Sequence, residues 1–335
     1  MKDKGIFVVT SVYHILLSIL LIEEYNLKQN ILVMVEITPD IETLKPNLAN
    51  SKWFDQVITM IGRKKQKQLA GKWQYTLNRK KIVPLIDANN PELKVLKSNL
   101  ASHDVYICSP DSAKNYFIYK YKNTSLFMIE DGLKTYIKQA PNRLSTLALK
   151  LIKRPVQNGF DQRIKTVFAT EASKLPKGLK EKGKDLHWKQ TLNNLSEADI
   201  NELVSVFITN ASLKDGSFFP QDKSKALIIT QSLSEDGFVK EEADKLKIYN
   251  TFINESETDL IYIKPHPREI TDYSQVYKAH DHVVVLPRLF PIELLNLLPQ
   301  LYFDSGFTAF STAIDNMTNI GKKTILGYDQ FKTSK

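Results

Sequence analysis

The chain has 335 residues, 42% of them hydrophobic and 25% charged, which is the composition of an ordinary folded protein and excludes dominant disorder. Its length exceeds the size at which a single core stops growing, so two domains are expected. The single cysteine, Cys108, excludes a disulfide framework within the chain and fits a reducing cytoplasm. The six histidines are scattered, with no Cys/His cluster, so no protein-bound metal is expected.

The formal net charge of +9 favours anionic partners. Nucleic acid is not expected, because the sequence holds no zinc finger, RNP-like aromatic motif or repeated basic helix. One dense basic cluster runs from Arg63 to Lys67. Such a cluster is typical of a solvated loop, and its alternative meaning is contact with an anionic membrane surface or an acidic glycan. We expect a cytoplasmic protein, with peripheral contact at the inner face of the cell membrane as an open alternative.

At the N-terminus, Lys2 and Lys4 precede an apolar run that resembles the start of a signal peptide. Polar residues within and after the run, among them Tyr13, His14 and Glu23, favour a strand followed by a buried helix instead. No stretch approaches the roughly twenty apolar residues of a membrane span.

Short apolar runs alternate with helix-like segments along the first half, which is the pattern of a parallel sheet with crossover helices. Residues 154–192 are rich in Lys, Gly and Pro, and we expect the crossing between two domains there, with a short strand at 167–169. The other predicted strands are 6–9, 31–35, 56–60, 105–108 and 126–129, with helical or mixed patterns at 65–86 and 90–100.

The same alternation restarts in the second half. Predicted strands cover residues 226–230, 260–263, 283–286, 300–304 and 324–327, and predicted helices cover 196–207, 241–252, 292–298 and 311–316. Two such halves predict an α/β protein with a GT-B-like fold, in which two doubly wound Rossmann-like domains face a central cleft. We place the boundary between the domains after residue 160, giving domains of residues 1–160 and 161–335. No internal sequence repeat is visible, so the duplication is one of architecture.

The tetrapeptide Lys264-Pro265-His266-Pro267 follows the predicted strand at 260–263. In open α/β sheets, ligands bind outside the carboxyl ends of the strands, where this tetrapeptide is expected to lie. The two prolines stiffen the loop around the imidazole. An ammonium and an imidazole two residues apart suit a negatively charged leaving group, and the alternative is a polar turn with an incidental histidine.

Glu130-Asp131-Gly132 stands in a corresponding position after the predicted strand at 126–129. The glycine permits backbone conformations that other residues resist, so a tight turn is expected. Glu-Asp-Gly is also a common turn sequence, which is the alternative interpretation. Each half of the chain therefore offers one acid/base group at a strand end.

A third segment, from Gly306 to Thr312, is predicted to follow the strand at 300–304 and to open the helix at 311–316. Hydroxyls and backbone N–H groups that converge at a helix start form an anion site. The alternative is an ordinary Ser/Thr helix cap. The sequence contains neither a Gly-x-Gly-x-x-Gly fingerprint nor a Walker-type loop.

Together with Glu293 in a Pro-x-Glu-Leu-Leu segment, these motifs resemble those of the bacterial sialyltransferases. Their order and spacing are similar to the Asp/Glu-Asp-Gly, His-Pro and Ser-Ser/Thr motifs of glycosyltransferase families 52 and 80 and of polysialyltransferases. The chain looks most like family 52, which makes sialylated capsule, exopolysaccharide or lipooligosaccharide. The resemblance implies inverting, metal-independent transfer of sialic acid from CMP-sialic acid to a galactose-containing glycan acceptor, with no cofactor.

The resemblance also implies residue roles. Asp131 would be the general base for the acceptor hydroxyl in the N-terminal domain, with Glu130 as an alternative base. In the C-terminal domain His266 would hydrogen-bond or protonate the phosphate of the departing CMP. The remaining donor-binding residues would be Lys264 and Pro267 beside His266, Glu293 at the ribose or cytosine, and Ser311 and Thr312 at the phosphate.

Two further sets of residues are candidates because of their positions alone. Gln231 and Ser232 follow the predicted strand at 226–230 and are candidates for contact with CMP. Thr10, Ser11, Tyr13 and His14 end the first strand and are candidates for the acceptor side, although helix capping and packing are the favoured interpretation.

The chemistry fits these residue types. A sialyl donor carries an activated phosphate leaving group, so an enzyme needs a base for the acceptor and fixed hydrogen-bond donors for the phosphate. A lysine, a histidine and a helix N-terminus can neutralise the leaving charge without a divalent metal. Inversion follows from a single in-line displacement with base and leaving group on opposite faces.

Three alternatives stay open at this stage. The first is a transferase for another CMP-linked acid sugar, or a polysialyltransferase. The second is a UDP-sugar hexosyltransferase or epimerase, although the Gly-rich phosphate loop expected of it is not evident. The third is a non-enzymatic protein that binds an anionic glycan or a membrane, and release of CMP from CMP-sialic acid would exclude it. The acceptor sugar, the linkage and the oligomeric state, with a homodimer as one option, are left open.

Overall fold

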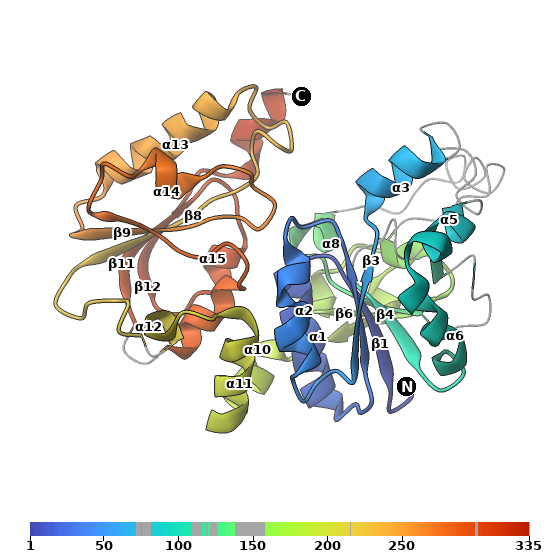
Figure 1. Ribbon diagram of the computed structural model, residues 1–335. Coiled ribbons are helices and arrows are strands. Elements are labelled where there is room, and N and C mark those ends of the chain that lie inside the picture. The colour runs from blue at the N-terminus through green and yellow to red at the C-terminus, as the bar shows by residue number, and fades with distance from the viewer. Residues whose placement is uncertain are drawn as a thin grey trace. The chain divides into compact units, whose positions relative to one another are not determined.

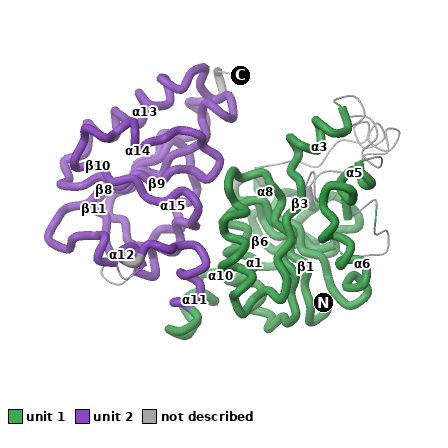
Figure 2. The backbone as a smooth tube through the Cα atoms, in the orientation of Figure 1, with its two compact units in different colours: residues 1–199 green, residues 200–335 purple. Residues whose placement is uncertain are grey.

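The computed structural model describes residues 1–71, 75, 82–108, 116–117, 120, 126–137, 158–214, 216–298 and 301–334. The chain divides into two compact units, Met1–Asp199 (unit 1) and Ile200–Lys335 (unit 2), shown in different colours in Figure 2. Each unit is built around one sheet whose strands all run parallel.

The sheet of unit 1 has the strand order β3-β2-β1-β4-β5-β6-β7. The order reverses beside β1, so the junction of β1 and β4 is the switch point of a doubly wound sheet. The strands are β1 (Gly5–Val9), β2 (Ile31–Val35), β3 (Gln56–Met60), β4 (Asp104–Ile107), β5 (Leu126–Ile129), β6 (Ile164–Ala169) and β7 (Gly183–Asp185).

Helices cover both faces of this sheet (Figure 1). The α-helices are α1 (Val12–Tyr25), α2 (Lys45–Ala49), α3 (Arg63–Ala70), α5 (Ile82–Asn89), α6 (Leu96–Asn99), α8 (Leu133–Ile137) and α10 (Trp188–Asn193), and α11 (Glu197–Phe207) crosses the boundary between the units. Short 3-10 turns lie at η1 (Ile41–Leu44), η3 (Pro91–Val95), η4 (Asn158–Phe160), η5 (Ala172–Lys174) and η6 (Lys180–Lys182).

Successive side chains along each strand point to opposite faces of the sheet, and because the strands of unit 1 are buried, both faces are apolar. One face carries a row of rings from neighbouring strands: Phe7 and Tyr106 stack at 4.7 Å between centroids, and Tyr106 and Phe127 at 5.2 Å. The other face, which includes Ile6 and Val8, joins a cluster that extends into α5 and α6. Cys108 is fully buried and packs as a small apolar residue.

The sheet of unit 2 has the order β10-β9-β8-β11-β12, with its switch point between β8 and β11. One face packs against α13 and α14 through a cluster that includes Ile228, Tyr249 and Tyr273. The strands are β8 (Lys225–Ile229), β9 (Leu260–Lys264), β10 (Val283–Val285), β11 (Phe303–Thr308) and β12 (Ile320–Ile325); the helices are α12 (Ala211–Lys214), α13 (Glu242–Glu255), α14 (Tyr273–Val276) and α15 (Ala313–Asn316), with 3-10 helices η7 (Ile292–Leu297) and η8 (Tyr328–Ser334).

The predicted fold class, an α/β protein of GT-B-like type, is confirmed. Each of the two units is a doubly wound Rossmann-like domain. The boundary differs from the one expected after residue 160, because β6 and β7 pair in parallel with the first sheet. Residues 161–199 therefore belong to unit 1, and the crossing to unit 2 lies within α11.

The prediction for β11 was shifted by several residues. The segment Asp304-Ser305-Gly306 reads as a turn, yet Ser305 and Gly306 pair with β8 on one side and β12 on the other. A Cβ at Gly306 would lie 3.0 Å from Cγ2 of Ile320, so the glycine serves close packing inside the strand. The strand ends at Thr308, and the loop to α15 is correspondingly short.

The predicted final strand was also misplaced, because β12 covers Ile320–Ile325 rather than residues 324–327. As an edge strand of its sheet it exposes Lys322 and Lys323, so it lacks the apolar run by which a buried strand is recognised. None of the helices in the described part of the chain is long and apolar enough to cross a membrane.

Candidate functional site

Asp131 lies at the carboxyl end of the sheet of unit 1, two residues after β5. Gly132 has a φ of +57°, the left-handed conformation that the turn requires. The hydroxyl of Thr135 accepts the backbone N–H of Asp131 at 2.7 Å, and the N–H of Thr135 donates to the carbonyl of Gly132 at 3.0 Å. This turn presents the carboxylate with 31% of its side-chain surface exposed.

The partner of Asp131 is His14, in the first turn of α1. Nε2 of the buried imidazole lies 2.9 Å from Oδ1 of Asp131. On the other side of the ring, Nδ1 accepts the backbone N–H of Thr10 at 3.4 Å and lies 3.0 Å from the Thr10 hydroxyl. Because Nδ1 is an acceptor, the neutral ring carries its proton on Nε2 and donates it to Asp131.

Glu130, the neighbouring carboxylate, is enclosed rather than presented. Its side chain accepts the Thr170 hydroxyl at 2.8 Å, the Thr170 backbone N–H at 2.7 Å, the Tyr13 hydroxyl at 3.1 Å and the Tyr136 hydroxyl. Burial and the Glu130 charge raise the pKa of Tyr136, which keeps its hydroxyl protonated as a donor. With four donors and 3% exposure, Glu130 ties the ends of β5 and β6 together.

His266 lies in the loop that follows β9, residues 265–269, here called the His-Pro loop. The loop forms a turn in which the backbone N–H of Glu269 donates to the carbonyl of His266 at 3.0 Å, with Pro267 at its second position. Reciprocally, Oε2 of Glu269 accepts the N–H of His266 at 2.7 Å. Nδ1 of the half-buried ring accepts the N–H of Arg268 at 3.1 Å, so in the neutral ring Nε2 is the donor.

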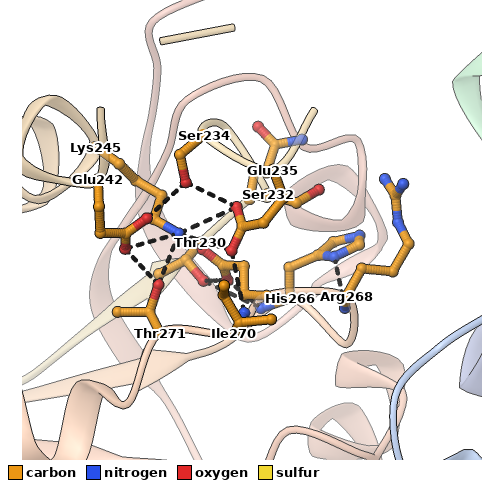
Figure 3. Close-up of polar contacts among 12 residues, drawn as sticks. Thr230, Ser232, Ser234, Glu235, Glu242, Lys245, His266, Arg268, Ile270 and Thr271 are labelled. Atoms are coloured by element: carbon orange, nitrogen blue, oxygen red, sulfur yellow. Dashed lines mark hydrogen bonds and ion pairs between the residues drawn. The ribbon is translucent and has the colours of Figure 1, made fainter. Parts of the chain in front are cut away.

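A buried ionic network supports this loop from behind (Figure 3). The fully buried Lys245 lies 3.0 Å from Glu235, 3.0 Å from Glu242 and 3.4 Å from Glu269, and it donates to the Thr271 hydroxyl at 2.7 Å. Burial alone would lower the pKa of Lys245, but the hydrogen bond with Glu242 and the charges of Glu269 and Glu235 raise it above its ordinary value. The lysine therefore stays charged and fixes Glu269, which fixes His266.

Lys264, the last residue of β9, does not point into solvent. Its Nζ donates to the carbonyls of Pro265 and Arg288, both at 2.9 Å, and it lies 4.8 Å from the centre of the Phe290 ring. Burial lowers the pKa of Lys264 to about 7, against the opposing charges of Glu269 and Glu293. In this arrangement the side chain shapes the His-Pro loop, and contact with a phosphate requires it to leave both carbonyls.

Arg268 is a cation beside His266 that the sequence motifs did not predict. Its guanidinium binds Asp236 through both terminal nitrogens, at 3.0 and 2.8 Å. Ser232, expected to contact CMP, is 3% exposed and donates to Asp236 at 2.9 Å. The loop after β8 and the His-Pro loop are thus joined through Asp236.

The loop after β11 is held beside β8. Oε1 of Gln231 accepts the backbone N–H of Phe310 at 2.8 Å. Ser311 is half-buried and Thr312 exposed, and the Ser311 hydroxyl accepts the N–H of Ala313 at 3.3 Å. The predicted helix is only one turn long, so the hydroxyls and nearby N–H groups, rather than a helix dipole, are what this loop offers an anion.

Glu293 is 3% exposed in η7, and its Oε1 accepts the side-chain N–H of Asn316 at 3.0 Å. The other predicted residues of unit 2 all stand at the carboxyl ends of β8, β9 and β11, neighbouring strands of one sheet. Asp131 stands in unit 1 with His14. For His14 the sequence favoured helix capping and packing, and Glu269 was not predicted at all, although it follows His266 by three residues, the spacing of a reciprocal capping pair.

Within the described residues, no three His, Cys, Asp or Glu side chains gather in a group that could hold a metal ion. In the described residues, the acid/base groups after β5 and β9 instead form hydrogen bonds with one another, with hydroxyl groups or with backbone N–H groups.

Comparison with known proteins decides the family. The model of glycosyltransferase family 52 matches residues 54–326, which include every motif discussed above. The chain belongs to glycosyltransferase family 52. It is therefore a glycosyltransferase, an enzyme class that binds a nucleotide-sugar donor and a glycan acceptor.

This family 52 member is 29% identical over 224 residues to an uncharacterized protein of Haemophilus influenzae, covering 65% of the chain and 67% of that relative. Among solved structures, it is similar to UDP-GlcNAc 2-epimerase from Neisseria meningitidis bound to UDP-GlcNAc, with 12% identity and a TM-score of 0.49, covering 93% of this chain and 78% of the other. The Methanocaldococcus jannaschii UDP-GlcNAc 2-epimerase gives 13% identity, a TM-score of 0.48, and coverage of 93% and 80%. These two similarities concern the general fold alone.

Proposed function

We propose that this glycosyltransferase is an inverting sialyltransferase that moves sialic acid from CMP-sialic acid to a galactose-containing acceptor of a bacterial surface glycan. The proposal is supported above all by the family 52 match over residues that carry both Asp131 and His266 at strand ends. The surroundings of the two carboxylates favour Asp131 over Glu130 as the base, because Glu130 is enclosed by four hydrogen-bond donors while Asp131 is partly exposed.

In this proposal Asp131 removes the proton of the attacking acceptor hydroxyl. His14 donates Nε2–H to Oδ1, which orients the partly exposed carboxylate. The proton of the acceptor moves to Asp131 as the new glycosidic bond forms. A general base positioned in this way contributes about a hundred- to ten-thousand-fold in rate.

Unit 2 holds the donor in this proposal. Nε2 of His266 donates to the CMP phosphate, whose negative charge grows as the bond to the sugar breaks. Ser311 and Thr312 donate hydroxyl hydrogen bonds to the same phosphate, and Glu293 accepts from the ribose or cytosine. Gln231, Ser232 and Pro267 shape the loops that carry these groups. Lys264 acts through its hydrogen bonds to the carbonyls of Pro265 and Arg288.

The direct test is incubation of the protein with CMP-sialic acid and a panel of galactosides, read by mass spectrometry. We expect CMP release together with a product heavier than its acceptor by one sialyl residue. A protein that uses only UDP-sugars, or that releases no CMP, would contradict the proposal. Products with several sialyl residues would assign it to polysialyl extension.

Transfer is expected to continue in excess EDTA. Fixed hydrogen-bond donors, with His266 foremost, are proposed to stabilise the leaving phosphate in place of a divalent cation. The measurement is the initial rate of CMP release before and after EDTA treatment, followed by addition of magnesium or manganese. Loss of activity in EDTA with rescue by either ion would refute metal-independent transfer.

His14→Phe is expected to lower kcat by roughly ten- to hundredfold, because the ring is retained but the donor that orients Asp131 is lost. The KM for CMP-sialic acid is expected to stay unchanged. His14→Gln places an amide N–H near the position of Nε2 and should restore much of the lost rate. If the phenylalanine and glutamine variants are equally impaired, or neither is, His14 does not position Asp131.

A further inference from the structure

Lys245 occupies a core position of α13. The buried residues of this helix are Lys245, Tyr249, Phe252 and Ile253, which recur at the spacing of a helix face that packs against a sheet. A lysine on such a face is unusual, because burying an ammonium group costs free energy even when it is paired, and apolar side chains of similar volume are often at least as stable. Stability alone therefore does not explain the charge at this position.

The ammonium group of Lys245 joins the connections that follow two neighbouring strands, β8 and β9. Glu235, 3.0 Å away, belongs to the loop after β8, and its Oε1 also accepts the backbone N–H of Ile270 at 3.0 Å (Figure 3). Thr271, whose hydroxyl accepts from Nζ at 2.7 Å, and Glu269, at 3.4 Å, belong to the connection between β9 and α14. One buried cation thus holds three consecutive residues of that connection, either directly or through Glu235.

Glu269 binds both backbone groups of His266. Oε2 of its carboxylate accepts the N–H of His266 at 2.7 Å, and its own backbone N–H donates to the carbonyl of His266 at 3.0 Å. The fully buried carboxylate is held by further donors: the hydroxyl of Tyr273 donates to Oε1 at 2.7 Å, and the hydroxyl of Thr230 donates to Oε2. A displacement of the Glu269 side chain therefore displaces the backbone of His266 and the ring that it carries.

The orientation of the His266 ring depends on the same turn. Nδ1 accepts the N–H of Arg268 at 3.1 Å, so the position of this N–H selects the tautomer in which Nε2 carries the proton. A hydrogen-bond donor stabilises a developing charge only where its geometry is held, and a misplacement of about 1 Å can cost about a hundredfold in rate. The turn that carries His266 is thus a place where a buried ion pair can serve the reaction rather than the stability of the fold.

We propose that Lys245 and Glu269 are positioning residues for His266, and that they hold the His-Pro loop in the arrangement that aims Nε2 at the phosphate of the nucleotide-sugar donor. The inference rests on the role of His266 in the proposed function. Both side chains are fully buried, so they act on the donor through His266. A carboxylate with an ammonium partner suits this task, because an ionised acceptor binds an amide N–H more strongly than a neutral one does.

The experiment is a double-mutant cycle, which measures kcat for CMP release from CMP-sialic acid in the unmodified protein and in the His266→Ala background. Glu269→Ala removes the acceptor of the His266 N–H and leaves Lys245 two other carboxylate partners. Glu269→Gln keeps the size of the side chain and an oxygen for that N–H. Lys247→Met, at an exposed lysine of the same helix, is the matched control.

We expect Glu269→Ala to lower kcat about a hundredfold in the unmodified protein but less than about threefold in the His266→Ala background, because a residue that acts through the ring loses its effect when the ring is absent. Glu269→Gln should recover most of the lost rate. Lys245→Met should lower kcat about tenfold, again only when His266 is present, and Lys247→Met should leave it unchanged. Equal losses in both backgrounds, or an unchanged kcat in folded Glu269→Ala, would overturn the proposal.

A second variant keeps the test decisive if Glu269→Ala does not fold. Lys245→Met combined with Glu269→Leu removes the same acceptor and replaces both buried charges by apolar side chains of similar volume, a change that proteins often tolerate. It takes the place of Glu269→Ala in the cycle, with the same expected results.

Nitrogen NMR of the histidine rings follows His266 without a donor, and the His266→Ala variant assigns its signals. We expect the Nε2–H tautomer in the unmodified protein and a mixture of both tautomers in Glu269→Ala or its substitute. A mixture in a protein that transfers no sialic acid would contradict the proposed function and leave the positioning role standing. Sialyl transfer by the unmodified protein, together with a single tautomer in the variant, would overturn the positioning role alone.

Discussion

Asp131→Ala is expected to lower kcat for sialyl transfer by about a hundred- to ten-thousand-fold, because it removes the proposed general base. The affinity for CMP should be nearly unchanged, since Asp131 belongs to unit 1 and the proposed nucleotide contacts belong to unit 2. Steady-state kinetics with CMP-sialic acid and calorimetric titration of CMP measure the two quantities separately.

Two further variants separate the base from its surroundings. Asp131→Asn keeps an oxygen that can accept Nε2–H of His14 but cannot take a proton, so it should be as inactive as the alanine variant. Glu130→Gln should instead lower thermal stability, because one amide group cannot accept from all four donors that surround Glu130. Near-normal turnover in folded Asp131→Asn would move the base elsewhere, with Glu130 the first residue to test.

The sequence predicted the strands best where both faces of a strand are buried. β2 and β5 occupy the predicted residues because each is a continuous apolar run inside a parallel sheet. The predicted positions of β11 and β12 were wrong by several residues. In β11, Gly306 looks like a turn residue but is required by close packing against Ile320. In β12, an edge strand, exposed lysines interrupt the apolar pattern. Such tertiary reasons leave no local pattern in the sequence.

In the candidate site, too, some residues could be predicted from the sequence and others could not. Asp131 and His266 could be located from sequence because each follows an apolar run, and the carboxyl ends of parallel strands gather at one edge of a sheet. Their partners come from distant segments: His14 is 117 residues from Asp131, and Asp236 is 32 residues from Arg268. Neither pairing has a periodic signal, so only the folded structure identifies it.

His266→Ala is expected to lower kcat by roughly a hundred- to a thousandfold, because it removes a fixed donor from a phosphate on which charge develops in the transition state. CMP affinity should fall less, by roughly tenfold, the cost of one hydrogen bond to a charged group. The loop itself should persist in this variant, since Glu269 binds the backbone N–H of residue 266 rather than its ring. His282→Ala, at an exposed position of unit 2, is the matched control and should leave both quantities unchanged.

Ser311→Ala combined with Thr312→Val is the companion variant, because it removes hydroxyls from the loop after β11 without altering the His-Pro loop. We expect weaker CMP binding and an unchanged KM for the acceptor, since an acceptor is proposed to contact Asp131 in unit 1. Calorimetric titration of CMP decides between the possibilities for both variants together. If His266→Ala and the Ser311/Thr312 variant both bind CMP as the unmodified protein does, unit 2 does not hold the nucleotide through these residues, and the assignment of donor and acceptor units has to be abandoned.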